Sequence, residues 1–154
     1  GEILCLAGLS AGLNATQKND YPITVLRGHS ISELVLSSEE IGFTGILNPD
    51  VIVALSQEGV DRRKAFFDTL DEETLILQVP EVKVPSCKAR IMHIDLKAQG
   101  IKSQDRALAS LSILAKLNKV ISLEMLQSAL KIRFKEPALS MSLDLVARVE
   151  TGSL

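Results

Sequence analysis

The hydrophobic pattern in the middle of the chain changes between the period of a strand and that of a helix. Residues 51–55 form a short apolar run, typical of a strand buried on both faces of a parallel sheet. Apolar positions at helical spacing predict a helix over residues 58–70, and residues 74–78 form the next strand of a right-handed βαβ crossover. Residues 79–88 contain two prolines and predict an excursion, because proline cannot donate to a strand ladder, before a strand over residues 89–96.

The pattern becomes helical after Gly100. Leucines at helical spacing predict three helices in this part of the chain. The first should begin at Ser103 as its N-cap and end near Asn118, which tolerates the left-handed conformation. Ser122 should cap the second helix, and Pro137 should separate it from the third.

The N-terminal third has a weaker pattern. Residues 3–15 are apolar on every side and predict a fully buried helix, whereas residues 14–20 are expected to be a polar connector. Pro22 favours extended backbone around it, Gly28 permits a turn, and residues 30–38 should form a strand. The whole pattern predicts an α/β fold: a three-layer α/β/α sandwich with a mostly parallel sheet and a helical C-terminal third.

Composition narrows the class of protein. The chain has 154 residues, of which 46% are hydrophobic and 23% charged, as expected for one globular domain. Its net charge of -2 comes from interspersed acidic and basic residues, so we expect no nucleic-acid binding. The longest apolar stretch, residues 3–13, is too short to span a membrane and lacks a basic leader. We therefore expect no membrane partner and a cytoplasmic location.

One compact set of polar residues could bind a ligand or take part in acid–base chemistry. Arg27, Gly28, His29 and Ser30 follow one another, and a guanidinium beside a glycine can bind a phosphate or carboxylate through paired hydrogen bonds. The alternative is a surface turn whose arginine forms a local salt bridge. His29 could serve as an acid or base, although no neighbour in the sequence is a carboxylate placed to orient it.

The other reactive residue types predict no catalytic centre. His93 is expected to be a half-buried, hydrogen-bonded strand residue, and neither histidine has a companion at metal-ligand spacing. Cys5 and Cys87 are isolated and are expected to be buried thiols, too few for an iron–sulfur cluster. No nucleophile or phosphate-loop motif is present. We therefore predict no catalytic residue and no metal site in this chain.

Four segments, in order, carry a family resemblance: Asp20-Tyr21-Pro22, Arg27-Gly28-His29-Ser30, residues 33–37 and residues 49–55. With them the chain resembles the gamma subunit, or gamma domain, of the 2-oxoacid:ferredoxin oxidoreductases, which act on pyruvate, 2-oxoglutarate or ketoisovalerate. That family also has a first strand and a Gly-Gly-Gln-Gly turn, of which at most Gly1 is retained. We expect both to lie before residue 1 of this single 1–154 domain; the alternative is a branch of the family that has lost the turn.

The resemblance implies a non-catalytic subunit of a complex. Such a complex oxidatively decarboxylates a 2-oxoacid, transfers the acyl group to coenzyme A and reduces ferredoxin. Its alpha, beta and ferredoxin-like subunits would hold thiamine diphosphate, magnesium and iron–sulfur clusters, while this chain holds no cofactor alone. The Asp-Tyr-Pro and Gly-His-Ser forms look more like the 2-oxoglutarate branch.

Within this family, two features would face the coenzyme A side or a neighbouring subunit. These are Tyr21 and the loop of Arg27, Gly28, His29 and Ser30. Met141 and Leu145 give the last helix a second apolar face, which suits a subunit covered by another chain. Two alternatives remain: a stand-alone nucleotide-binding module and a structural interaction module. The chain could form a homo-oligomer when isolated.

Overall fold

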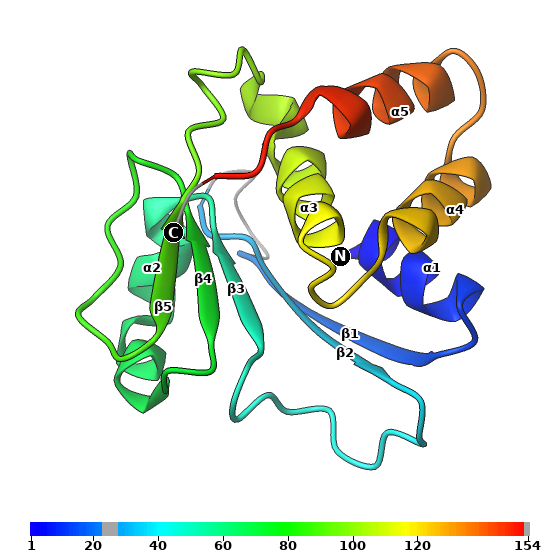
Figure 1. Cartoon of the computed structure of the whole chain (residues 1–154). Helices are drawn as coiled ribbons and strands as arrows, with labels where there is room; N and C mark the ends of the chain where they lie inside the picture. The colour runs from blue at the N-terminus through cyan, green and yellow to red at the C-terminus, as the bar shows by residue number, and fades with distance from the viewer. Residues whose placement is uncertain (23–27, 153–154) are drawn as a thin grey trace.

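A parallel three-stranded sheet lies at the centre of the fold (Figure 1). The computed structural model describes residues 1–22 and 28–152. The strands are β3 (Val51–Ala54), β4 (Leu75–Gln78) and β5 (Arg90–His93), in the order β3-β4-β5. All four residues of β4 are buried, as expected for a central strand with helices on both faces. The three predicted strands are confirmed, although β5 is shorter than residues 89–96.

The crossover from β3 to β4 is helical, but it is not one continuous helix over residues 58–70. It consists of α2 (Gln57–Arg62) and the 3-10 helix η1 (Lys64–Thr69), and Arg63 between them has φ -114° and ψ 20°. The 3-10 period of three residues per turn brings Phe67 and Leu70 to the same side. Both side chains reach the core, with exposed fractions of 3% and 4%.

An antiparallel hairpin precedes the parallel sheet. It pairs β1 (Asn14–Asp20) with β2 (Ile31–Ser37), in a register that sets Asn14 opposite Ser37 and Asp20 opposite Ile31. The predicted strand over residues 30–38 is confirmed. The polar connector over residues 14–20 is wrong, because backbone pairing with β2 makes a strand of a segment whose side chains give no apolar alternation.

The N-terminal helix is shorter and more exposed than its sequence suggests. Helix α1 (Glu2–Ser10) ends before Gly12, which has φ +80°. Of its residues only Ala7 and Gly8 are buried, and Leu9 is 56% exposed, so the prediction of a helix buried on every side is wrong. The side of α1 that carries small residues packs on the hairpin, where Gly8 lies against Leu36.

Three α-helices form the C-terminal third, as predicted: α3 (Arg106–Lys116), α4 (Leu123–Arg133) and α5 (Ala138–Arg148). Ser103 is not the N-cap of α3, because it starts a separate 3-10 turn, η2 (Ser103–Asp105). The other two boundaries are confirmed. Asn118 has φ 51°, and the Ser122 hydroxyl accepts a hydrogen bond of 3.2 Å from the Met125 N–H.

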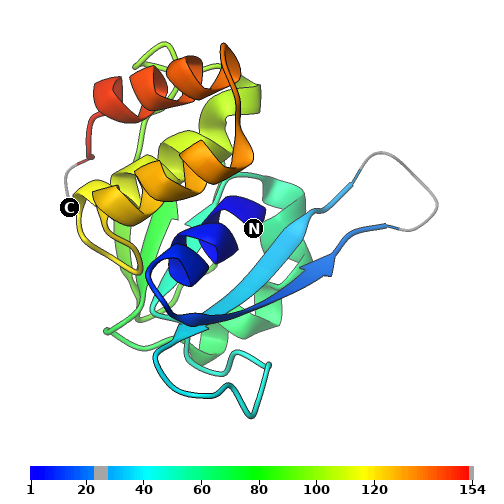
Figure 2. The ribbon, with the colours of Figure 1, turned by 90° about the vertical axis from the view of Figure 1, so that its right-hand side faces the viewer.

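The helices cover the two faces of the parallel sheet, which gives the predicted layered α/β arrangement (Figures 1 and 2). Helices α2 and η1 lie on one side, and α3 lies on the other together with α1, α4 and α5. The main core joins the sheet to α3, α2 and η1, and a second cluster joins α1, α3, α4 and α5. On α5, Leu145 is in the core and Met141 is 69% exposed, so only Met141 remains available to a neighbour.

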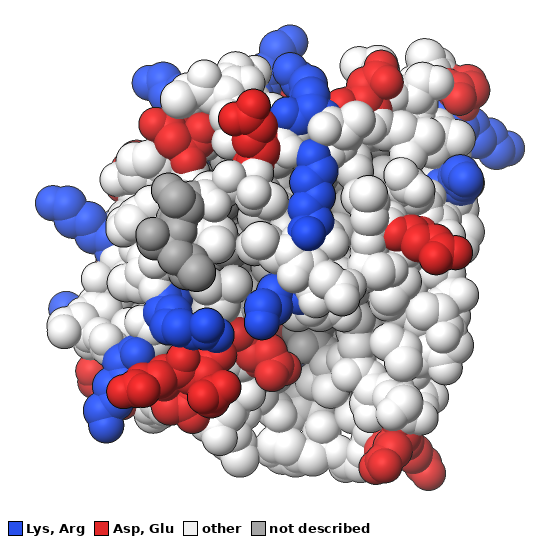
Figure 3. All heavy atoms as spheres, in the orientation of Figure 1, with Lys and Arg blue, Asp and Glu red and all other residues white. Residues whose placement is uncertain are grey.

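The surface carries both signs of charge. Acidic and basic side chains are interspersed on the face seen in Figure 3, with wide uncharged areas between them. Exposed apolar side chains include Phe43 and Leu47, at 67% and 72%, in the connection from β2 to β3. Within the described residues, no helix has both the length and the apolar character needed to cross a bilayer.

Candidate functional site

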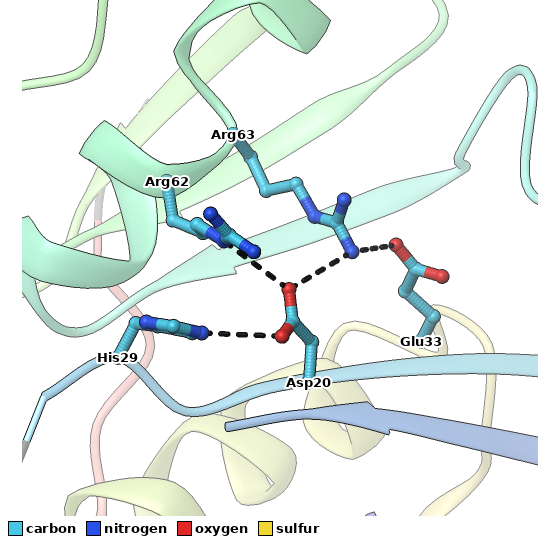
Figure 4. A network of polar contacts seen from close by, with 5 residues as sticks. All are labelled: Asp20, His29, Glu33, Arg62 and Arg63. Atoms are coloured by element: carbon cyan, nitrogen blue, oxygen red, sulfur yellow. Dashed lines mark hydrogen bonds and ion pairs between the residues drawn. The ribbon is translucent and has the colours of Figure 1, made fainter. Parts of the chain in front are cut away.

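A cluster of ion pairs joins the end of the hairpin to the end of α2 (Figure 4). The Asp20 carboxylate is at its centre, with Oδ1 3.1 Å from His29 Nε2 and Oδ2 3.5 Å from both Arg62 Nε and Arg63 Nη2. Arg63 Nη2 also lies 3.0 Å from Glu33 Oε1. We refer to these five residues as the Asp20 cluster.

The strand register explains how residues distant in sequence meet here. Asp20 is the last residue of β1 and lies opposite Ile31, so His29, two residues before Ile31, is close to it. The two arginines arrive from the crossover: Arg62 ends α2 and Arg63 follows it directly. The side chain of Ser56 accepts a hydrogen bond of 3.3 Å from the Gly59 N–H and so fixes where α2 begins.

The cluster stabilises the charged form of Asp20. The hydrogen bond from His29, followed by the positive charges of Arg62 and Arg63, lowers the pKa of the Asp20 carboxyl below its ordinary value. Two carboxylates balance two guanidinium groups, so the cluster is close to neutral when His29 is neutral. Asp20 and Glu33 are each 27% exposed and His29 is 20% exposed, whereas Arg62 is 57% exposed.

The structure brings together only part of the predicted site. His29 belongs to the cluster, and Asp20 orients it, so the expectation that no carboxylate is placed to do so is wrong. Gly28 has φ +128°, which confirms the predicted turn. Tyr21 is 60% exposed and Ser30 is also exposed. Arg27 lies outside the described residues.

Four members of the cluster were not predicted as site residues: Asp20, Glu33, Arg62 and Arg63. The adjacent arginines at the end of α2 were a usable signal, but helical periodicity by itself indicates only a solvated face for such residues. Asp20 could be linked to His29 only by pairing residues 14–20 with residues 31–37. Treating the first of these segments as a connector concealed the link.

Arg62 and Arg63 could serve as ligands for an anion. Among residues 1–22 and 28–152, Arg62 makes one ion-pair contact, of 3.5 Å through Nε, and its side chain is more than half exposed. Arg63 Nε is buried and has no hydrogen-bond partner among residues 1–22 and 28–152. A guanidinium with unused N–H groups suits a phosphate or a carboxylate.

The remaining reactive residues lie apart from this cluster. His93 is exposed rather than half-buried, because it is the last residue of β5 and points away from the core. Cys5 and Cys87 are partly rather than fully buried, and partial burial raises the pKa of the Cys5 thiol. In the described part of the chain, no three His, Cys, Asp or Glu side chains are grouped to hold a metal ion.

A cavity apart from the Asp20 cluster is relevant to the alternative function, a stand-alone nucleotide-binding module. It has a volume of about 630 Å³ and lies where the chain leaves the carboxyl ends of β4 and β5. Its lining is of mixed charge: Arg106 pairs with Glu81, and Asp95 adjoins Lys97. The Arg106 charge, after a hydrogen bond from the backbone of Glu81 itself, contributes to lowering the pKa of the Glu81 carboxyl. Lys102 also lines the cavity, so three basic side chains face two acidic ones there and the charges alone do not exclude a nucleotide phosphate.

Comparison with known proteins identifies the class. Residues 1–149 match the family model described as pyruvate ferredoxin/flavodoxin oxidoreductase, and the chain belongs to this family. The 2-oxoglutarate synthase subunit KorC of Methanocaldococcus jannaschii is 28% identical over 150 residues, with 84% of this chain and 76% of that protein covered. The predicted family, that of the 2-oxoacid:ferredoxin oxidoreductases, is confirmed.

Solved structures share the fold. The gamma subunit of a keto/oxoacid ferredoxin oxidoreductase from Geobacter sulfurreducens aligns with a TM-score of 0.70 at 22% identity, covering 95% of this chain and 84% of that one. Pyruvate oxidoreductase subunit PORC from Thermotoga maritima gives 0.70 at 18%, covering 98% and 86%. A 2-oxoglutarate:ferredoxin oxidoreductase from Magnetococcus marinus, with 2-oxoglutarate, coenzyme A and succinyl-CoA bound, gives 0.75 at 19%, covering 95% of this chain and 27% of that one.

Proposed function

We propose that this chain works as the gamma subunit beside alpha, beta and ferredoxin-like subunits, and that thiamine diphosphate, magnesium and iron–sulfur clusters are held by those partners. The observation that carries the proposal is the family match over residues 1–149. The complex would oxidise a 2-oxoacid to an acyl-CoA and pass the electrons to ferredoxin. Because KorC is named as a 2-oxoglutarate synthase subunit, 2-oxoglutarate is the proposed substrate.

Within this complex, the Asp20 cluster and Tyr21, Gly28 and Ser30 beside it are proposed to face the coenzyme A side, as Arg27 would. Coenzyme A, when bound, supplies the thiol that accepts the acyl group and also carries phosphate groups. The half-exposed guanidinium of Arg62 suits such an anion. Asp20 and Glu33 keep the two guanidinium groups in position, and no bond-breaking step is assigned to this chain.

The test uses the reconstituted complex with three variants, Arg62→Ala, Arg27→Ala and Arg148→Ala. Arg148 is an exposed arginine at the end of α5, so its variant removes the same charge away from the cluster. We expect Arg62→Ala and Arg27→Ala each to raise the KM for coenzyme A by about tenfold, the loss of one charge-assisted hydrogen bond of about 1.4 kcal/mol. Arg148→Ala should leave this KM unchanged.

Assembly is measured on the same variants by size-exclusion chromatography. An unchanged KM for coenzyme A in both Arg62→Ala and Arg27→Ala, with intact assembly, would remove the proposed role. The subunit assignment is tested separately by a pull-down with this chain as bait. Recovery of no thiamine-diphosphate or iron–sulfur subunit would contradict it.

The substrate is tested by assaying the reconstituted complex with 2-oxoglutarate and pyruvate under the same conditions. The proposal expects a higher kcat/KM for 2-oxoglutarate. A preference for pyruvate would reject the substrate while leaving the subunit assignment in place.

A further inference from the structure

The cavity at the carboxyl ends of β4 and β5 has no role in the proposed function, and no residue of the Asp20 cluster lines it. Its volume, about 630 Å³, is that of a small-molecule site. In open parallel sheets, ligands bind outside the carboxyl ends of the strands, where the loops supply polar groups. The wall consists of Pro80 and Glu81 after β4, Asp95 and Lys97 after β5, and Ile101, Lys102, Ser103 and Arg106 on the way into α3.

The two carboxylates of the cavity already have partners within the chain. Asp95 accepts a hydrogen bond of 2.9 Å from the Ala98 N–H, in the turn that follows β5. Glu81 pairs with Arg106 Nη1, and it also interacts with the positive charge of Lys97. The repulsion that these carboxylates would exert on an incoming anion is therefore partly offset.

The basic side chains of the cavity retain donors for a ligand. Among residues 1–22 and 28–152, neither Lys97 nor Lys102 forms an ion pair, and both side chains are exposed. Arg106 is more deeply placed, with 19% of its side chain exposed, and its contact with Glu81 uses Nη1. Three basic groups therefore face two acidic ones, and the Nζ atoms of both lysines are open to an anion.

The first turn of α3 adds backbone donors to the same wall. Arg106 is the first of the 11 residues of α3, so the positive end of this helix lies at the cavity. In the described part of the chain, the N-cap residue Asp105 makes no side-chain cap to the helix. Ser103, two residues earlier, lines the cavity and can donate through its hydroxyl. A helix start beside arginine, lysine and serine side chains suits a phosphate group.

We propose that this cavity binds a small phosphate monoester, whose phosphate is held by Lys97, Lys102 and Arg106. The cavity is larger than a phosphate ion, and Pro80 and Ile101 make part of its lining apolar. The organic group of the ester lies against these two residues. The inference stands independently of the gamma-subunit assignment, because it uses only residues that line this cavity.

The test is a titration of the purified 154-residue chain with phenyl phosphate at constant ionic strength, followed by NMR of the backbone amides. The amide signals of Ser103 and Arg106 should shift and saturate, whereas those of α4 should not move. Inorganic phosphate should bind about fivefold more weakly, because it has no apolar group to bury. Coenzyme A also carries a phosphate monoester and is titrated in parallel. Tighter binding than that of phenyl phosphate at the same two amides would identify coenzyme A as the source of the ester, and weaker binding would identify a free ester.

A double variant tests the two lysines. Lys97→Gln with Lys102→Gln should raise the Kd for phenyl phosphate by about tenfold, because two ammonium groups that contact the phosphate are lost. Lys131→Gln with Lys135→Gln is the control. It removes the same charge from exposed lysines that do not line the cavity, and it should leave the Kd unchanged.

Glu81→Gln should have the opposite effect. It should lower the Kd by about threefold, because Arg106 Nη1 then becomes available to the phosphate. The control is Glu124→Gln, in the first turn of α4, which should not change the Kd. A gain in affinity cannot result from damage to the fold, so this variant tests the site separately from stability.

Three results would overturn the proposal. Signals of Ser103 and Arg106 that do not shift and saturate would show that the cavity binds no phosphate ester. Equal changes in Kd for the cavity variants and their controls would show a general attraction between charges rather than a site. Equal affinity for inorganic phosphate and phenyl phosphate would reject the ester, because Pro80 and Ile101 would then contribute nothing.

Discussion

Two residues on α4 provide a direct test of the second core cluster. Leu130 has an exposed fraction of 0% and packs among residues of α1, α3 and α5, whereas Ile132 is 61% exposed on the same helix. Both are large aliphatic residues, two positions apart. Leu130→Ala and Ile132→Ala therefore remove similar side chains from opposite environments.

The expected loss for Leu130→Ala follows from its burial. The substitution removes three carbon atoms, and at about 0.8 kcal/mol per buried methylene the lost transfer free energy is about 2.4 kcal/mol. The cavity left among α1, α3 and α5 raises the loss of free energy of unfolding to about 3 to 4 kcal/mol. For Ile132→Ala the change should stay within about 0.5 kcal/mol, because the side chain is solvated and alanine favours the helix.

The assay is urea denaturation followed by circular dichroism, supported by thermal unfolding. For a chain of this size, a loss of about 3 kcal/mol lowers the Tm by roughly 6 to 12 °C. The m-value should not change, since both variants bury nearly the same surface. A loss below about 1 kcal/mol for Leu130→Ala, or equal losses for the two variants, would refute the packing of α1 against α4.

Three further predictions concern charge, capping and backbone strain. Because the pKa of Asp20 is lowered in the folded state, its carboxylate stabilises the fold at pH values above about 4, and this stabilisation is lost as the pH falls through the folded-state pKa. Asp20→Asn should therefore make the urea midpoint fall less steeply as the pH is lowered. An unchanged pH dependence would contradict this. Ser122→Ala should cost about 1 kcal/mol in urea denaturation, because the Met125 N–H loses its partner, and Ser128→Ala on the same helix is the control. Val120 has φ 65°, so Val120→Gly should unfold at higher urea than Val120→Ala, by about 1 kcal/mol, and the reverse order would show that the residue is unstrained.

Local signals predicted most of the regular structure. The apolar run at residues 51–55 and the strand at residues 74–78 were recognisable because a central strand needs apolar side chains on both faces. Asn118 and Ser122 marked helix boundaries because their side chains suit those backbone positions. The helix predicted over residues 58–70 is in fact divided into α2 and η1, and this division was missed. The change to 3-10 geometry depends on Phe67 reaching the core, which is a tertiary contact.

Only part of the candidate site could be predicted from the sequence. His29 and Gly28 stand in a short contiguous motif, so sequence alone could select them. The partner of His29 is Asp20 on β1, and Asp20 in turn pairs with arginines at the end of α2. No local pattern connects these segments. Asp20 and His29 meet because of the strand register between β1 and β2. Backbone hydrogen bonds set this register, and the polar side chains of β1 give no pattern from which it could be predicted.

By itself, the sequence determined the order of most strands and helices after residue 30, the family and the turn at Gly28, because each depends on residues close together in the chain. Tertiary structure alone decided that Asp20 meets Arg62 and Arg63, and that β2 and β3 face each other across a groove. Both of these depend on how separate elements pack. Packing geometry is set by contacts between residues far apart in the sequence, which periodicity and local propensity do not encode.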